Sequence, residues 1–123
     1  MLAAMNEVRT AHGLPALRVD GTLRRAAQSH SVDMVRHNYF AHGNLGSRMR
    51  AYHVHGPLTG ENLAWGTGSA ARARVIVDEW MASPPHRANL LRPGFRRVGI
   101  GAVIGRFAGY PRAAVVTADF AGR

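Results

Sequence analysis

Three side chains that could bind a ligand or transfer a proton stand in unusual sequence contexts. Glu61 is one of only three glutamates in the chain, and it lies between a glycine and an asparagine in the sequence Gly-Glu-Asn-Leu-Ala-Trp at residues 60–65. His86 follows two prolines and precedes a short apolar segment, and His42 ends the sequence Tyr-Phe-Ala-His. Imidazoles and carboxylates are the groups that proteins use for acid–base chemistry and for holding metal ions. Together these residues suggest a His/Glu/His pocket.

Each of these side chains also has a structural interpretation. His42 and His86 could hydrogen-bond to the backbone or to Glu61 and so tie the walls of a cleft together. Glu61 could accept hydrogen bonds from backbone N–H groups at a sharp turn after Gly60, and Asn62 is expected to orient its neighbours rather than to ligate. Because polar clusters mark functional sites only in some proteins, both a structural role and weak binding of a metal or ligand stay open.

Helical periodicity and helix-end residues predict the elements that must position these groups. The first helix is expected over residues 2–12 and is closed by Gly13, with Pro15 soon after. Asp20 is expected to cap a second helix that runs to about Asn38. One face of this helix is apolar at helical spacing and is expected to pack in the core, with His30 as a buried histidine on it.

The second half of the chain changes from helix to strand. Ser69 is expected to cap a third helix that Pro84 and Pro85 stop, with a short helix over residues 87–91. Residues 97–105 and 113–121 are β-like and are expected to pair as antiparallel strands joined by an eight-residue loop, 105–112. Between the second and third helices, residues 43–57 are expected to form a loop with one or two helical turns near residues 48–53. This order of elements predicts the α+β class.

Composition limits the kinds of partner and chemistry. A chain of 123 residues is expected to form one domain, and with no cysteine it has no disulfide, thiolate metal site or cysteine nucleophile. No apolar run reaches the roughly 20 residues of a membrane span, and residues 1–5 lack the basic start of a secretory signal. The formal net charge is +9, and every basic residue is arginine. Arginine favours polyanionic partners, but scattered arginines without interleaved aromatic residues argue against nucleic acid.

Short motifs along nearly the whole chain resemble the CAP superfamily, which comprises cysteine-rich secretory, antigen 5 and pathogenesis-related 1 proteins. The resemblance is to its short, cysteine-free bacterial form, and the matching segments are residues 6–9 with 12–17, 39–42, 60–65, 80–91, 98–101 and 115–120. It implies a single CAP domain over residues 1–123, folded as a three-layer α-β-α sandwich with a small central antiparallel sheet. It also implies a cleft with two histidines and two acidic residues, of which His42, Glu61 and His86 occupy three places. The fourth place departs from the family pattern, because it is Ser83 rather than a glutamate.

The resemblance implies a secreted or cell-envelope binding module rather than an enzyme. Its expected ligand is a lipid, or an anionic envelope polymer attracted by the arginines, with Asn62 and Ser83 in the ligand cleft and with peripheral contact to a membrane surface. Two imidazoles and one carboxylate are adequate zinc ligands, but without the fourth acidic residue we expect only weak divalent metal binding. The alternative is a metal-dependent hydrolase in which His42 and His86 ligate the metal and Glu61 is a ligand or general base.

Overall fold

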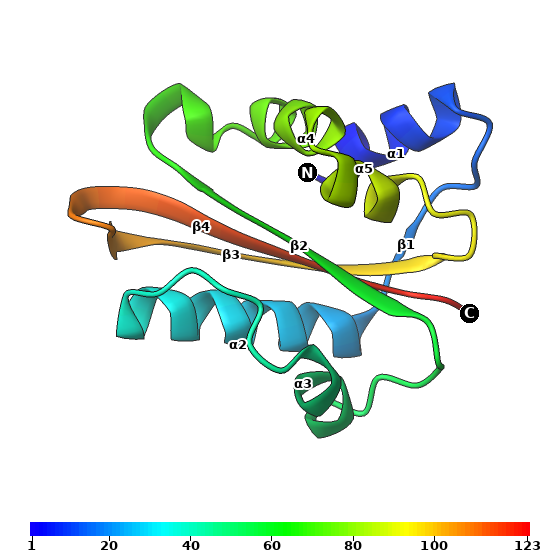
Figure 1. Ribbon diagram of the computed structural model, residues 1–123, viewed down its shortest axis with the longest axis horizontal. Helices are drawn as coiled ribbons and strands as arrows, with labels where there is room; N and C mark the ends of the chain where they lie inside the picture. The colour runs from blue at the N-terminus through cyan, green and yellow to red at the C-terminus, as the bar shows by residue number, and fades with distance from the viewer.

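The computed structural model describes residues 1–123 as a four-stranded sheet between two layers of helices (Figure 1). Helices α2 and α3 cover one face of the sheet, and α1, α4 and α5 cover the other. The strand order is β1-β3-β4-β2, with β1 parallel to β3 and the other pairs antiparallel. In chain order the elements are α1 (Leu2–Ala11), β1 (Arg18–Val19), α2 (Gly21–His37), α3 (Leu45–Ala51), β2 (Thr59–Gly66), the 3₁₀ helix η1 (Gly68–Ala71), α4 (Ala73–Ala82), α5 (Pro84–Leu90), β3 (Arg97–Phe107) and β4 (Tyr110–Ala121). The expected α+β class and three-layer sandwich are confirmed.

The second helix agrees with its sequence signals at both ends. Asp20 accepts hydrogen bonds from the backbone N–H groups of Thr22 and Leu23 at 2.9 and 3.1 Å, which satisfies donors that a helix start leaves unpaired. The helix ends where Asn38 adopts a left-handed conformation with φ of 51°. Its apolar face is buried as predicted, and this face includes His30.

Two glycines of β3 allow α2 to lie directly against the sheet. A Cβ atom at Gly99 would stand 2.1 Å from the backbone nitrogen of Arg24, and one at Gly101 would stand 2.3 Å from that of Gln28. No side chain fits in such a space, so the glycines set the distance between helix and strand. This packing explains the Val-Gly-Ile-Gly sequence at residues 98–101.

The sequence-based predictions of where α4 and α5 begin are wrong. Ser69 does not cap α4, because it lies within η1, and α4 begins at Ala73 after Arg72. Gly68 turns the chain with a positive φ of 56° just before Ser69, so the segment packs as a separate 3₁₀ turn. Helix α5 begins at Pro84, earlier than expected, because proline's fixed φ suits the first turn of a helix.

The predicted eight-residue loop between the last two strands is also wrong. Strands β3 and β4 extend through it and leave only Ala108 and Gly109 as the turn, with φ of 52° and 84°. Two consecutive residues with positive φ match the right-handed twist of the strands, which favours a tight hairpin. Gly109 is in this turn, and Gly105 lies instead at a register irregularity between Gly105 and Phe107.

Strand β2 was not predicted, since the residues after Gly60 were expected to form a sharp turn. The strand pairs with β4 along its whole length, and Glu61 lies opposite Asp119. Residues 61–64 are all buried, so the strand lacks the polar–apolar alternation that signals a half-exposed strand. The region expected to be mainly loop contains α3, which begins at Leu45.

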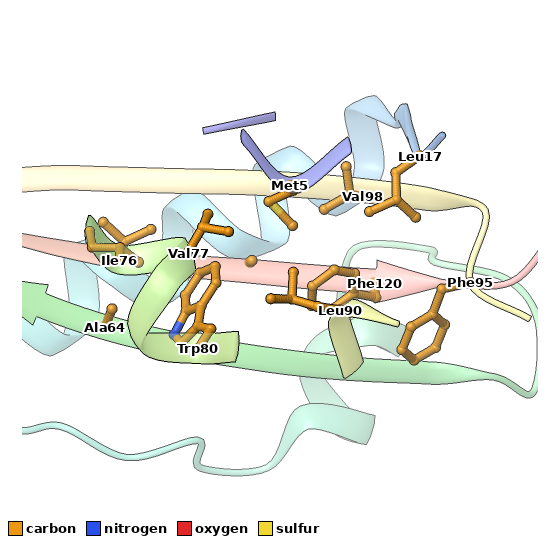
Figure 2. Close-up of a cluster of buried hydrophobic side chains, with 12 residues drawn as sticks. Met5, Leu17, Ala64, Ile76, Val77, Trp80, Leu90, Phe95, Val98 and Phe120 are labelled. Atoms are coloured by element: carbon orange, nitrogen blue, oxygen red, sulfur yellow. The ribbon is translucent and has the colours of Figure 1, made fainter. Parts of the chain in front are cut away.

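The largest hydrophobic cluster lies between the sheet and the α1, α4 and α5 layer (Figure 2). Trp80 belongs to it and donates a hydrogen bond from Nε1 to the carbonyl oxygen of Leu63 at 3.0 Å. The rings of Phe95 and Phe120 stack with centroids 5.3 Å apart. This cluster fixes α4 and α5 on β2 and β4.

Arg9 joins the first helix to the connection between α5 and β3. Its guanidinium is fully buried and donates hydrogen bonds to the carbonyl oxygens of Pro15 at 2.8 Å, Leu90 at 2.9 Å, Arg92 at 3.1 Å and Phe95 at 3.0 Å. Burial and the nearby charge of another arginine lower its pKa from the usual value. The contact holds the C-terminal end of α5 in place. None of the helices is sufficiently long and apolar to span a bilayer.

Candidate functional site

Glu61 and Asn62 point to opposite faces of the sheet, because successive side chains of a strand alternate. Glu61 lies on the face covered by α2, where its Oε1 is 4.0 Å from Nε2 of His30. Asn62 lies on the other face, where its amide donates a hydrogen bond to the carbonyl oxygen of His86 at 3.0 Å. The sequence grouped Glu61 with His42 and His86, whereas the structure divides these residues between the two sides of β2.

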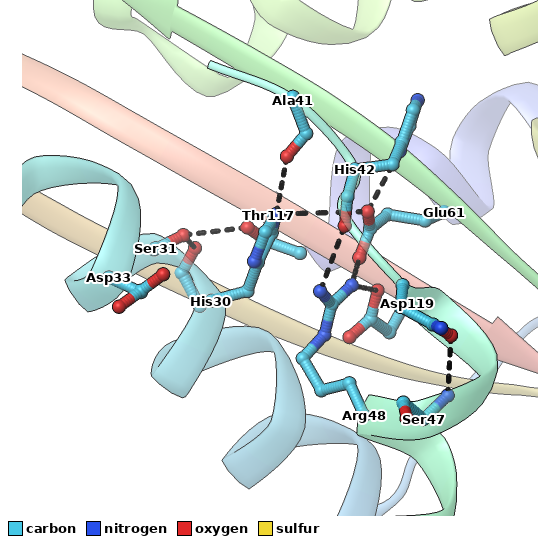
Figure 3. A network of polar contacts seen from close by, with 12 residues as sticks. His30, Ser31, Asp33, Ala41, His42, Ser47, Arg48, Glu61, Thr117 and Asp119 are labelled. Carbon is cyan, nitrogen blue, oxygen red and sulfur yellow. Dashed lines mark hydrogen bonds and ion pairs between the residues drawn. The ribbon is translucent and has the colours of Figure 1, made fainter. Parts of the chain in front are cut away.

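The Glu61 carboxylate is held by a histidine and an arginine (Figure 3). Its Oε1 is 2.8 Å from Nδ1 of His42, and its Oε2 accepts a hydrogen bond from Nη2 of Arg48. Arg48 also donates from Nη1 to the carbonyl oxygen of His42 at 3.1 Å. The side chain of Glu61 is 1% exposed and that of Arg48 is 11% exposed, so this is a nearly buried ion pair. The His42–Glu61 hydrogen bond expected from the structural interpretation is present, but Glu61 accepts from side chains rather than from a turn.

Asp119 places a second buried carboxyl group beside that of Glu61. It is fully buried opposite Glu61 on β4, with Oδ1 at 3.9 Å from Nη2 of Arg48. Neither carboxyl oxygen has a hydrogen-bond partner of good geometry. Burial and the neighbouring Glu61 raise the pKa of Asp119 to about 10. Burial opposes ionisation of Glu61 too, but Asp119, Arg48 and the histidines together lower its pKa. The pair therefore consists of an ionised Glu61 beside a protonated Asp119 near neutral pH.

A second polar network links α5 to β2 on the opposite face. Nδ1 of His86 lies 2.8 Å from Oγ of Ser83, so the serine is within reach of the imidazole despite the two prolines between them. Asn89 donates to the side-chain oxygen of Asn62 at 2.9 Å and to the carbonyl oxygen of Glu61 at 3.0 Å. The expectation that Asn62 orients its neighbours agrees with these bonds.

Only glycine fits at position 60, next to the polar network of Glu61 and that of Asn62. A Cβ atom there would stand 2.8 Å from the ring of Phe95 and 3.0 Å from the side-chain oxygen of Asn89. A larger residue would displace Asn89 and thereby α5 from the strand. The glycine of the Gly-Glu-Asn sequence therefore keeps the two layers close.

The buried and half-buried histidines favour the neutral form. Burial, followed by the charge of Arg48, lowers the pKa of His30, and its Nε2 lies 2.8 Å from the carbonyl oxygen of Ala41. Burial and the proximity of His42 lower the pKa of His86. Both histidines lie beside β2, which is an edge strand: the His42 ring bonds Glu61, and the carbonyl oxygen of His86 accepts from Asn62. A neutral imidazole is the form that ligates metals.

The family resemblance implies a metal site, and the positions of the candidate ligand atoms show how well the residues fit one. No group of three or more His, Asp or Glu side chains is arranged to hold a metal ion. Both oxygens of Glu61 are engaged, by His42 and Arg48, and the arginine's charge opposes a nearby divalent cation. The Nδ1 atoms of His42 and His86 are engaged by Glu61 and Ser83, which leaves their Nε2 atoms for a ligand. The residues fit a two-imidazole site with Glu61 behind His42 better than a three-ligand site.

A cavity of about 730 Å³ lies on the α2 and α3 side, next to this cluster. Its lining includes His30, Tyr39 and Arg48, but not Glu61 or His86. Sequence reasoning missed this cavity because its walls come from three separate segments: α2, the loop after it and α3.

Sequence reasoning also missed Arg48 and Asp119 as members of the cluster. Arg48 is one of sixteen arginines, and nothing in its local sequence distinguishes it. Asp119 carries a usable signal, because it is an acidic residue within an otherwise apolar strand. A buried carboxyl group in such a strand points to polar neighbours, and here these are Arg48 at 3.9 Å and Glu61 on the paired strand.

Comparisons with known proteins agree with this fold. A profile described as the cysteine-rich secretory protein family, CAP, matches residues 2–120. YkwD of Bacillus subtilis is 35% identical over 80% of this chain, which spans 39% of YkwD. An extracellular protein with an SCP domain from Bacillus anthracis superposes with a TM-score of 0.76 at 31% identity, covering 97% of this chain and 38% of its own. A cysteine-rich secretory protein from Staphylococcus aureus has the same fold, with a TM-score of 0.73 at 22% identity over 99% of this chain and 37% of its own.

The chain thus spans well under half the length of these three relatives. The family match nevertheless covers almost every residue described above, including both halves of the polar site. The chain belongs to the cysteine-rich secretory protein (CAP) family.

Proposed function

We propose that this chain is a secreted or cell-envelope binding module of the CAP type that recognises anionic envelope components without catalysing a reaction. The observation that carries the proposal is how the chain uses its seven acidic residues. Glu61 and Asp119 are buried with Arg48, while Glu7 pairs with Arg74 at 2.6 Å and Asp20 pairs with Arg97 at 2.8 Å. Four of the seven acidic side chains therefore already contact an arginine of the same chain.

The arginines are not neutralised to the same extent. Of the sixteen, three form ion pairs with carboxylates and Arg9 is buried against carbonyl oxygens, so the other twelve are left without an acidic partner. Unpaired guanidinium groups bind phosphate and carboxylate groups through paired hydrogen bonds. An anionic lipid or wall polymer outside the cell is a ligand of this chemistry, and the extracellular Bacillus anthracis relative supports that location.

Binding of the purified chain to anionic vesicles and to an anionic wall polymer tests this proposal. We expect binding at about 50 mM salt that is largely lost by about 500 mM, because exposed charges are screened over shorter distances as salt rises. Neutral phosphatidylcholine vesicles are the control. Absence of binding to both anionic probes at low salt would refute the proposed function.

A second function, divalent metal binding between His42 and His86, is favoured by the engagement of both Nδ1 atoms. A bound zinc ion would supply a Lewis acid able to activate water, which is the basis of the hydrolase alternative. In that alternative Glu61 would have to leave Arg48 to serve as a ligand or general base. Calorimetric titration with zinc chloride, repeated on His86→Ala and His42→Ala, tests this function. Unchanged weak affinity in both variants would exclude the site.

A further inference from the structure

One end of the sheet exposes large hydrophobic side chains. Five such side chains are substantially exposed in the whole molecule, and three of them gather near the β3–β4 turn: Phe40 at 44%, Ile104 at 59% and Tyr110 at 49%. Figure 1 shows this turn and the C-terminal end of α2 at the end of the molecule opposite the C-terminus. We call this end of the molecule the hairpin-end surface. Phe40, Trp65 and Tyr110 lie with Phe107 on its α2 side, Ile104 and Arg112 lie on the other side of the sheet next to η1, and Arg106 is close to the turn.

The aromatic rings of this surface rest on a rigid base. Phe107 is 2% exposed, and its ring packs edge-on against Trp65 at 5.5 Å and Phe40 at 6.5 Å between centroids. Trp65 in turn contacts Tyr110 at 5.7 Å. The exposed rings are thus held in place, so binding another surface would cost little side-chain ordering. Aromatic rings with one apolar and one polar part are enriched at the boundary between lipid and water.

Positive charge surrounds these rings and no carboxylate balances it nearby along the chain. Arg106 and Arg112 flank the turn, are exposed and pair with no acidic side chain. Between residues 80 and 118 the sequence contains six arginines and no Asp or Glu. The carboxylate on the last part of α2, Asp33, is engaged by the hydroxyl of Tyr39 at 2.5 Å. The surface therefore combines apolar rings with unpaired guanidinium groups.

We propose that the hairpin-end surface docks this chain onto an anionic phospholipid bilayer. Phe40, Ile104 and Tyr110 enter the headgroup region, while Arg106 and Arg112 bind lipid phosphates. Charge alone would serve a hydrophilic polymer equally well, but exposed apolar rings gain free energy only where hydrocarbon is available. The inference rests on the proposed function and identifies the face and the partner that carry it out.

Vesicle binding by charge-matched variants tests the face. Dissociation constants are measured for vesicles of phosphatidylglycerol and phosphatidylcholine with the double variant Arg106→Gln/Arg112→Gln. We expect binding about thirtyfold weaker, at roughly fivefold per arginine near an anionic surface. The matched control is Arg18→Gln/Arg96→Gln, which removes the same charge at the opposite end of β3. We expect the control to weaken binding less than about threefold, because its arginines stay more than a Debye length from the membrane.

A matched pair of aliphatic variants tests the apolar contact. Ile104→Ser removes a side chain that is 59% exposed on the hairpin-end surface, and Val19→Ser removes one that is 58% exposed on β1. We expect Ile104→Ser to weaken vesicle binding about fivefold and Val19→Ser to leave it unchanged, since only the first buries apolar area in lipid. Brominated lipids should also quench Trp65 fluorescence, while Trp80 is 3% exposed in the core and should be shielded.

Equal weakening by the two arginine double variants, or by the two serine variants, would overturn the docking face while leaving the proposed function intact. Binding of the unaltered chain to soluble polyphosphate but not to vesicles would overturn the membrane partner. Failure to bind either probe would instead refute the proposed function. Unfolding curves confirm that each variant is folded, which is expected because all of the replaced side chains are at least partly exposed.

Discussion

Replacing Arg48 by methionine removes the only cation that contacts both buried carboxyl groups of the site. Nη2 of Arg48 bonds Oε2 of Glu61 and lies 3.9 Å from Asp119, and the Glu61 side chain is 1% exposed. Loss of one partner of a buried ion pair typically costs about 3–5 kcal/mol, because the other charge stays in a low-dielectric environment. Protonation of Glu61 limits the loss, so we expect about 3 kcal/mol at pH 7 and less at pH 5.

A double-mutant cycle separates the ion pair from the loss of packing around Arg48. Urea unfolding is measured for Arg48→Met, Glu61→Gln and the double variant, with linear extrapolation to water. We expect a coupling free energy of about 2 kcal/mol between the two positions. The control is Arg50→Met, an exposed arginine on the same helix that forms no ion pair, which should change stability by less than about 0.5 kcal/mol.

Two results would refute this reasoning. A coupling free energy below about 0.5 kcal/mol would show that Arg48 contributes only packing, as for many surface pairs. Equal destabilisation by Arg48→Met and Arg50→Met would show that the position within α3, rather than the contact with Glu61, determines the loss.

Three further perturbations follow from the packing and the charges. Arg9→Met removes four buried hydrogen bonds to carbonyl oxygens and should lower the free energy of unfolding by about 4 kcal/mol, with Arg9→Lys intermediate; a urea midpoint within experimental error of the original would contradict this. The substitution Asp119→Asn should stabilise the fold, and the gain should increase as pH rises. In the folded chain the Asp119 carboxyl group, with its pKa raised from 3.8 to about 10, keeps its proton, whereas in the unfolded chain it releases the proton above about pH 4. The gain should grow by up to roughly 1.4 kcal/mol per pH unit between pH 5 and 8, and an equal gain at both pH values would exclude a protonated Asp119. Gly99→Ala places a Cβ 2.1 Å from the Arg24 nitrogen and should cost at least about 3 kcal/mol by thermal unfolding, whereas Gly21→Ala, with its nearest neighbour atom at 3.5 Å, should be tolerated.

Local signals were sufficient for the helix that begins after Asp20. A capping side chain, an apolar face at helical spacing and a left-handed Asn38 are all encoded within about 20 consecutive residues. The same signals failed at Ser69, because the chain preceding α4 turns to pack against β2, and a contact between segments outweighed a favourable cap residue. Strand β2 was missed for a related reason, since its hydrogen bonds go to β4, a strand far along the chain that pairs Thr59 with Ala121 and Gly66 with Ala114.

The sequence identified some members of the polar cluster, but it missed Arg48 and Asp119 and did not give the arrangement. His42 and Glu61 do meet, as their motifs suggested, and His86 lies next to the same strand, where its carbonyl oxygen accepts from Asn62. Their grouping as three ligands of one metal remains a prediction, and the contact between Arg48 and Glu61 is its main obstacle. Asp119 was overlooked because a single acidic residue in a strand does not say which residue lies opposite.

The sequence by itself determined the net charge of +9, the absence of thiol chemistry, the α+β class and the resemblance to the CAP family, since these depend on residue types and on order along the chain. Only the tertiary structure decided that Glu61 and Asn62 serve opposite faces of β2, and that one arginine among sixteen neutralises the buried carboxylate. Strand pairing brings Glu61 and Asp119 together from positions 58 residues apart, and α3 adds Arg48. Such long-range contacts set which charges are buried and which remain on the surface to bind a partner.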